Sequence, residues 1–105
     1  MELTRNKEQE LIVISIYDAI IYSTMGEEFS LEAIMSGVYG LPYDEIPYYS
    51  KSITIKSLSH LNEIKKIYQA KMPKWNFDRL NPVEQAILLM SYTHFNEEKV
   101  DKKIV

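Results

Sequence analysis

The sequence predicts an all-α domain, a helical bundle of about four to five helices. Its long segments carry apolar residues at spacings of three and four, and none of them alternates as a half-buried strand would. Short joins containing Gly or Pro separate these segments. The 105 residues contain no internal repeat and suffice for one modest hydrophobic core. We therefore expect a single domain over residues 1–105.

The segment from residue 75 to residue 95 gives the strongest helix prediction. Asn81 can cap the helix with its side-chain oxygen, and Pro82 fits the first helical position. Glu84 follows three residues after the cap, which completes the pattern of a helix start. Apolar residues then recur on one helical face, at Val83, Ala86, Ile87 and Met90. A helix with this much apolar surface is expected to lie between other elements.

Two large aromatic residues, Trp75 and Phe77, come just before this helix. Each has enough apolar area to hold the incoming chain against the helix. The whole segment is therefore expected to form the buried spine of the domain, with Trp75 in the interior.

Residues 2–25 are predicted to form the first helix, with Thr4 as its candidate cap. The β-branched residues between positions 12 and 16 would suit a strand equally well, and the length of the segment favours a helix. Polar residues at spacings of seven and three predict a narrow solvent-facing stripe, formed by Glu8, Ser15 and Asp18.

A second, short helix is predicted to begin after Ser30 and to end near Gly37 and Gly40. Residues 43–47 then form a loop or one helical turn. Residues 48–71 are predicted to form a single third helix, because apolar residues recur there at helical spacing, at Ile55, Leu58, Leu61, Ile64 and Tyr68.

Pro73 is expected to end that third helix. The helix that begins at Pro82 is expected to stop near Asn96, and Asp101 could cap a further helix at the end of the sequence.

Composition argues against several kinds of protein. The chain has no cysteine, which excludes disulfides, thiolate zinc sites and thiol nucleophiles and fits a cytoplasmic location. The apolar run at residues 11–14 is too short to span a bilayer, and residues 1–9 are too acidic for a secretory signal. We therefore expect a cytoplasmic protein with no membrane partner.

The formal net charge of −3 hides an asymmetry between the two halves of the chain. Residues 1–50 carry a net charge of −7, and residues 51–105 carry +4. An acidic chain is a poor non-specific binder of nucleic acid, but a local basic face can still contact phosphates. Each lysine taken singly is more simply explained as part of a solvated helix face.

No arrangement of residues typical of catalysis is present in the sequence. His60 and His94 are the only histidines, they fall on different predicted helices, and neither belongs to a zinc-binding pattern. The three glycines are too scattered to wrap a phosphate. We therefore expect a protein that is not an enzyme and that uses no cofactor or metal.

The segment around the predicted spine resembles the signature helix of the transcription antitermination factor NusB family, which reads roughly W-x-x-x-R-L-x-x-x-E-[RKQ]-A-I-L-R. The matching residues are Trp75, Arg79, Leu80, Glu84, Ala86, Ile87 and Leu88. Two weaker stretches are similar to the family as well, with matches at Arg5, Glu10 and Tyr17 and at His60, Glu63 and Ile64. The chain departs from the family's usual residues at Gln9, Lys56, Lys65, Leu89 and His94.

This resemblance implies a fold of two small helical subdomains and a role in transcription antitermination. Family members bind the boxA stretch of ribosomal RNA leader together with a small-subunit ribosomal protein, and they recruit an antitermination complex to RNA polymerase. By resemblance, Arg5, Lys7 and Tyr17 would contact single-stranded RNA, and Glu84 would lie near the joint surface for RNA and the protein partner. Without the resemblance, the first two belong to an exposed helix end, Tyr17 to the core and Glu84 to a helix start.

The family pattern continues for roughly two further helices beyond position 105, so the resemblance implies an incomplete second subdomain with its C-terminal helices missing. The Pro82 helix should then expose an apolar face, which would favour self-association or a protein partner. Two alternatives stay open. One is a protein-interaction bundle of the same fold that does not bind RNA. The other is the RNA-binding module found at the amino terminus of some RNA cytosine methyltransferases.

Overall fold

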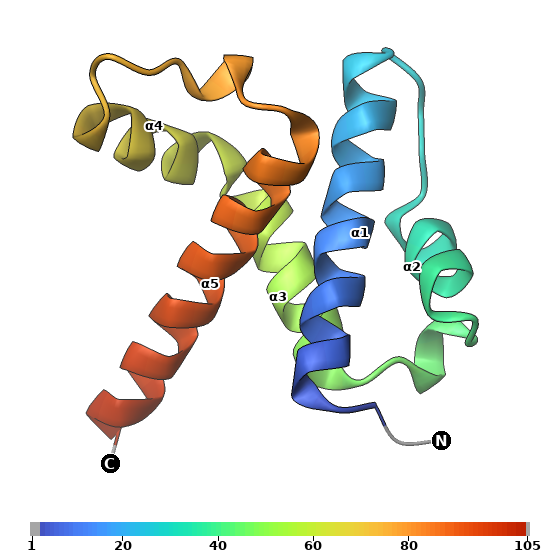
Figure 1. The fold of residues 1–105 in the computed structure, drawn as a ribbon. Helices are drawn as coiled ribbons and strands as arrows, with labels where there is room; N and C mark the ends of the chain where they lie inside the picture. The colour runs from blue at the N-terminus through green and yellow to red at the C-terminus, as the bar shows by residue number, and fades with distance from the viewer. Residues whose placement is uncertain (1–2, 105) are drawn as a thin grey trace.

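The computed structural model describes the backbone of residues 3–104 and the side chains of residues 3–97. Within residues 3–104 the chain forms helices and no strand, which confirms the all-α prediction (Figure 1). The elements are α1 (Arg5–Thr24), α2 (Leu31–Tyr39), the 3₁₀ turn η1 (Tyr43–Glu45), α3 (Tyr48–Ser59), α4 (Leu61–Lys71), the 3₁₀ turn η2 (Phe77–Arg79) and α5 (Pro82–Ile104).

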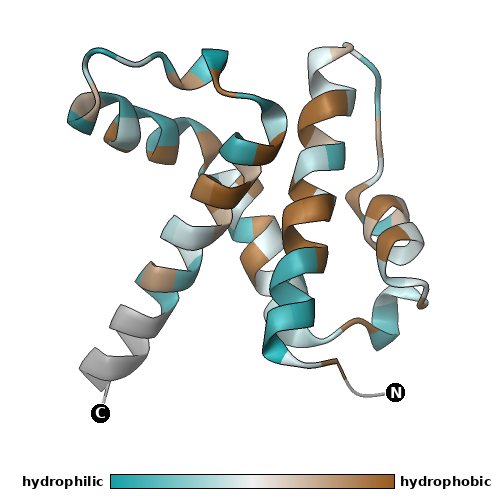
Figure 2. Cartoon of the chain, viewed as in Figure 1, coloured by the Kyte–Doolittle hydropathy of each residue, from teal (hydrophilic) through white to brown (hydrophobic). Residues whose placement is uncertain are grey.

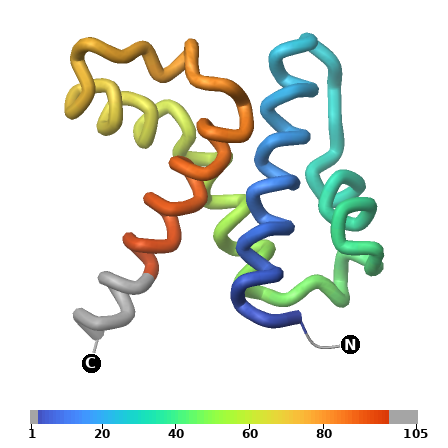
Figure 3. The backbone as a smooth tube through the Cα atoms, in the orientation of Figure 1, coloured from blue at the N-terminus to red at the C-terminus, as the bar shows by residue number. Residues whose placement is uncertain are grey.

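Helix α1 holds the fold together, because it contacts α2, α3 and α5. Helix α2 lies on one side of α1 and α5 on the other (Figure 1). Helix α3 passes behind both α1 and α5 and contacts each of them (Figure 3). Helix α4 starts beside the upper part of α5 and runs away from it, and the chain returns over α4 to η2 (Figure 1). The result is a flat molecule of 44 × 42 × 19 Å.

The core lies where α1, α3, α4 and the first half of α5 meet. Its fully or nearly fully buried members are Ile12, Ile16, Ile53, Ile64, Phe77, Ala86 and Leu89. Figure 2 shows this pattern along the ribbon, with apolar residues concentrated in the middle of α1 and polar residues in its first turns. The first turns of α1, where its polar residues are concentrated, contribute no residue to this core.

The predicted polar stripe of α1 is wrong at Glu8 and Ser15. Glu8 is 7% exposed and Ser15 is fully buried. The Ser15 hydroxyl donates to the Leu11 carbonyl at 2.9 Å, and the Glu8 carboxylate accepts from the Ser50 hydroxyl at 3.0 Å. These bonds offset the loss of water. Burial raises the pKa of neighbouring Tyr39 to about 12, with a smaller contribution from the Glu8 carboxylate.

The predicted third helix over residues 48–71 is divided in two. Helix α3 ends at Ser59, His60 has φ −106° and ψ 19°, and α4 begins at Leu61. No Gly or Pro marks this break, so local sequence gives no sign of it. An unbroken helix of this length would extend about 36 Å. The break turns the chain so that Ile64 reaches the same core as Ile53.

Helix α5 begins as predicted, with Asn81 and Glu84 bonded to each other at its start. The Glu84 N–H donates to Asn81 Oδ1 at 2.8 Å, and Asn81 Nδ2 donates to the Glu84 carboxylate at 2.7 Å. The predicted stop near Asn96 and the separate helix at Asp101 are wrong, because α5 continues to Ile104.

The buried face of α5 also differs from the prediction. It follows the spacing Ala86, Leu89 and Thr93, whereas Val83 and Ile87 are 45% and 44% exposed. Phe95, eight residues after Ile87, is 64% exposed. The reason is that the other helices cover α5 from one side only. Apolar residues are therefore exposed along this helix.

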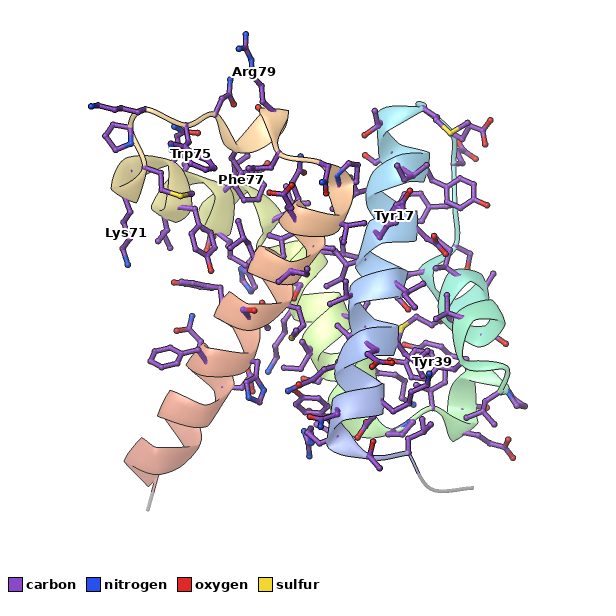
Figure 4. All side chains as sticks on the ribbon, viewed as in Figure 1. Tyr17, Tyr39, Lys71, Trp75, Phe77 and Arg79 are labelled. Atoms are coloured by element: carbon purple, nitrogen blue, oxygen red, sulfur yellow. The ribbon has the colours of Figure 1, made fainter. Side chains whose placement is uncertain are left out.

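The prediction for Trp75 is wrong, and the prediction for Phe77 is confirmed. Trp75 is 61% exposed, and Phe77 is 1% exposed. The Phe77 ring lies over the Tyr68 ring with 6.3 Å between their centroids. Phe77 thus holds the incoming chain against the core alone, and Trp75 lies outside it (Figure 4).

Candidate nucleic-acid interface

A groove of about 650 Å³ lies where the first turns of α1 and α3 meet the second half of α5. Its lining is mainly polar and aromatic, and comes from three helices: Arg5, Gln9, Tyr48, Tyr49, Ser52, Ile53, His94 and Glu97. A cation, an amide, an imidazole and exposed aromatic surface come together here.

Tyr49 forms the centre of the groove and links all three helices. The Arg5 guanidinium carbon lies 3.6 Å from the centroid of the Tyr49 ring, a cation–π contact. Gln9 Nε2 donates to the Tyr49 hydroxyl at 3.3 Å. The same hydroxyl lies 2.6 Å from His94 Nδ1, and the two rings meet edge to face. These contacts hold the Tyr49 ring in one orientation.

Local structure explains why these side chains gather. Thr4 caps α1 by accepting from the Lys7 N–H at 3.1 Å, which places Arg5 in the first turn. Pro47 precedes α3 and sets Tyr48 and Tyr49 as its first two residues, without a side-chain cap. The positive end of the α3 dipole therefore adjoins the groove. Tyr48 is 80% exposed and makes no ring contact among the described residues.

The groove also contains an acidic group. Glu97 lines it and forms an ion pair with Lys56 at 2.6 Å. This ion pair lies between the groove and a second, smaller cavity of about 290 Å³ bounded by His60 and Tyr92. Since the Lys56 ammonium lies beside it, the Glu97 carboxylate opposes an approaching anion less than an unpaired carboxylate would.

The structure separates the residues that the family resemblance assigned to RNA. Arg5 lies in the groove, while Lys7 is exposed outside it and pairs with Glu10 at 3.5 Å. Tyr17 is half-buried against the core, about 18 Å further along α1 than Arg5. Glu84, assigned to the partner surface, is exposed at the start of α5 and bonded to Asn81.

Sequence analysis missed Tyr48, Tyr49, Gln9 and His94 as binding residues. The Tyr-Tyr pair directly after Pro47 at a helix start was the one local signal available. In the sequence, Gln9 and His94 are distinguished only as departures from the family pattern. In the fold they bond to the same Tyr49 hydroxyl, although 85 positions separate them.

Neither a metal-binding cluster nor a membrane-spanning helix is found in the part of the chain that the structure describes. Among residues 3–97, no group of three or more His, Asp or Glu side chains could hold a metal ion. No helix in the described part of the chain is both long and apolar enough to cross a bilayer.

Comparisons with protein-family models, with curated proteins and with solved structures found no match to this chain.

Proposed function

We propose that this protein binds single-stranded RNA through the groove around Tyr49, as an antitermination factor of the NusB type. The observation that carries the proposal is the Arg5–Tyr49 contact beside exposed Tyr48. Single-stranded RNA is bound by stacking its bases on aromatic rings and on guanidinium planes, with hydrogen bonds to base edges and phosphates. Tyr48 supplies an open ring, Arg5 a cation, and Gln9 and His94 polar groups.

Some of the residues that match the family pattern support the assignment, and others count against it. The capped start of α5 and the exposure of Glu84 fit a helix that presents its first turn to a partner. Exposed Trp75 counts against the assignment, because this residue begins the block that carries the resemblance. Leu89 is fully buried, so in this chain that position could not hold the family's arginine as a surface contact.

In the proposed role, the RNA is a boxA-like leader segment and the protein partner is a small-subunit ribosomal protein that docks near Glu84. The pair would act within an antitermination complex on RNA polymerase in the cytoplasm. The chain would contribute binding surfaces only, with no catalysis and no cofactor.

The test is a titration of fluorescently labelled boxA-like RNA, followed by anisotropy, with and without the ribosomal partner. Replacing Arg5 with Gln should weaken binding and lower the salt dependence by about 0.7 in the slope of log K against log salt. Tyr49→Ala should weaken binding more, since it removes a ring and releases Arg5. Lys51→Gln is the charge-matched control, because Lys51 lies beside Tyr43, and it should leave binding unchanged. Equal binding of boxA-like and random RNA in both conditions would exclude the proposal.

A second candidate function is a protein-interaction bundle without RNA binding. The exposed apolar residues Val83, Ile87 and Phe95 on α5 favour it, because several large apolar side chains exposed on one helix supply area that a protein partner could bury. It predicts self-association in analytical ultracentrifugation or a protein partner whose capture survives nuclease treatment. Replacing Phe95 with Ser should abolish that association and leave any RNA binding in place.

A further inference from the structure

The segment that joins α4 to η2, residues 72–76, displays a tryptophan that neither the core nor the groove uses. Trp75 is 61% exposed, while Phe77, two residues later, is 1% exposed. Large aromatic side chains gain free energy on burial, so an outward tryptophan needs a structural cause.

The cause is Gln69, whose side chain holds the segment on both sides of Trp75. Gln69 Nε2 donates to the carbonyls of Met72, at 3.3 Å, and Trp75. Gln69 Oε1 accepts from the Phe77 N–H at 2.9 Å. The Trp75 N–H donates to the Met72 carbonyl at 2.9 Å, which closes a turn. These bonds hold the backbone of the segment, while most of the Trp75 side chain stays exposed.

Positive charge surrounds this tryptophan. Residues 65–79 contain five cations and one acid, Asp78, and that acid pairs with Lys65. The other cations are exposed and form no ion pair among the residues with described side chains: Lys66, Lys71, Lys74 and Arg79. Figure 4 shows Lys71 and Arg79 pointing away from the protein on opposite sides of the segment that holds Trp75.

We propose that this segment is a second RNA contact, in which a base stacks on Trp75 while Lys74 and its neighbours contact phosphates. The inference rests on the proposed function and adds a site to it. A rigid aromatic platform flanked by cations is the arrangement that binds single strands with little sequence preference. The positive charge of this segment favours a polyanion such as RNA as the partner, since residues 66–77 contain lysines and no carboxylate. The segment leads through η2 to the start of α5, and that start lies about 18 Å along the helix from His94 in the groove. A strand that follows α5 and then η2 would reach both sites.

Trp75 is the only tryptophan, so it reports its own contacts. We would excite it at 295 nm and titrate with unlabelled single-stranded boxA-like RNA, with inorganic polyphosphate as a control that has charge but no bases. Stacking should quench the fluorescence with RNA and not with polyphosphate. Trp75→Ala should weaken RNA binding about fivefold or more, Trp75→Phe less, and circular dichroism should show both variants folded. Lys74→Gln should lower the salt slope by about 0.7, and Lys51→Gln should not.

The outcomes separate this site from the groove. RNA binding with unchanged Trp75 fluorescence and unchanged affinity in Trp75→Ala overturns the second site and leaves the groove proposal standing. Quenching that persists while Arg5→Gln and Tyr49→Ala bind normally supports the second site and removes the groove. Quenching by polyphosphate equal to that by RNA overturns stacking. Failure of RNA to bind at all overturns both.

Discussion

At the contact between α1 and α3 polar side chains are buried, whereas at the α4–α5 end of the molecule apolar side chains are exposed. Glu8, Ser15 and Ser50 are almost or completely inaccessible in the first region. Trp75, Ile87 and Phe95 are at least 44% exposed in the second. Both regions contradict a simple partition of residues by hydropathy, in opposite directions.

The difference in burial follows from the number of neighbours that each helix has. Helix α1 is contacted by three other helices, so even the polar residues Glu8 and Ser15 are covered, and these find hydrogen-bond partners. Helix α5 and the segment before it are covered from one side, so apolar residues on the other side meet solvent. The buried polar contacts specify how α1 and α3 align, and the exposed apolar residues leave surface for partners.

The largest expected effect comes from placing the family's arginine at the buried side of α5. Leu89→Arg should lower the free energy of unfolding by more than about 4 kcal/mol, because it removes a core side chain and buries an unpaired charge. Urea denaturation followed by circular dichroism measures this. Ser91→Arg, at an exposed position on the same helix, should change stability by less than about 0.5 kcal/mol. A stable Leu89→Arg variant would mean that α5 presents a different face.

The next largest expected effect is a difference in stability between substitutions of the two aromatic residues before α5. Phe77→Ala should lower the free energy of unfolding by about 3–5 kcal/mol, since the ring fills the core against Tyr68. Trp75→Ala should change it by less than about 0.5 kcal/mol. Thermal and urea unfolding of the pair give the comparison directly. Similar losses in both variants would show that Trp75 is buried in solution.

The buried polar contact between α1 and α3 should contribute a smaller amount. Ser50→Ala leaves the Glu8 carboxylate without the donor at 3.0 Å and should lower the free energy of unfolding by about 1–3 kcal/mol. Ser59→Ala, at an exposed position on the same helix, is the matched control and should be within about 0.5 kcal/mol of the parent protein. No difference between the two serine variants would count against a buried Glu8.

The smallest effect is a pH dependence at Tyr39. Its pKa is raised from 10.0 to about 12 by burial, so the unfolded chain loses this proton at a lower pH than the folded protein. The resulting contribution to stability is complete below pH 10 and is lost as the pH rises through 12. Urea midpoints at pH 9 and pH 11.5 should fall further for the parent protein than for Tyr39→Phe. The remaining tyrosines are common to both proteins, so equal losses would show that Tyr39 is not perturbed.

The sequence determined that the chain is helical, and it determined where three of the helices begin. Thr4, Ser30 and Asn81 were predicted as caps, and each accepts from the backbone N–H three residues later. Caps involve residues a few positions apart, so the residue types at a helix start fix them. The short second helix ended near Gly40 as expected, because Gly40 adopts φ 68°, which glycine accommodates without strain.

Only the tertiary structure decided which side of each helix is buried, where residues 48–71 break, and that Phe77 rather than Trp75 enters the core. It also joined Gln9 and His94 over Tyr49 to make the candidate site. The physical reason is that burial depends on which other helices lie alongside, and those neighbours come from distant parts of the chain. Helical spacing predicts a face, but the packing of α1 and α5 selects the face that loses water.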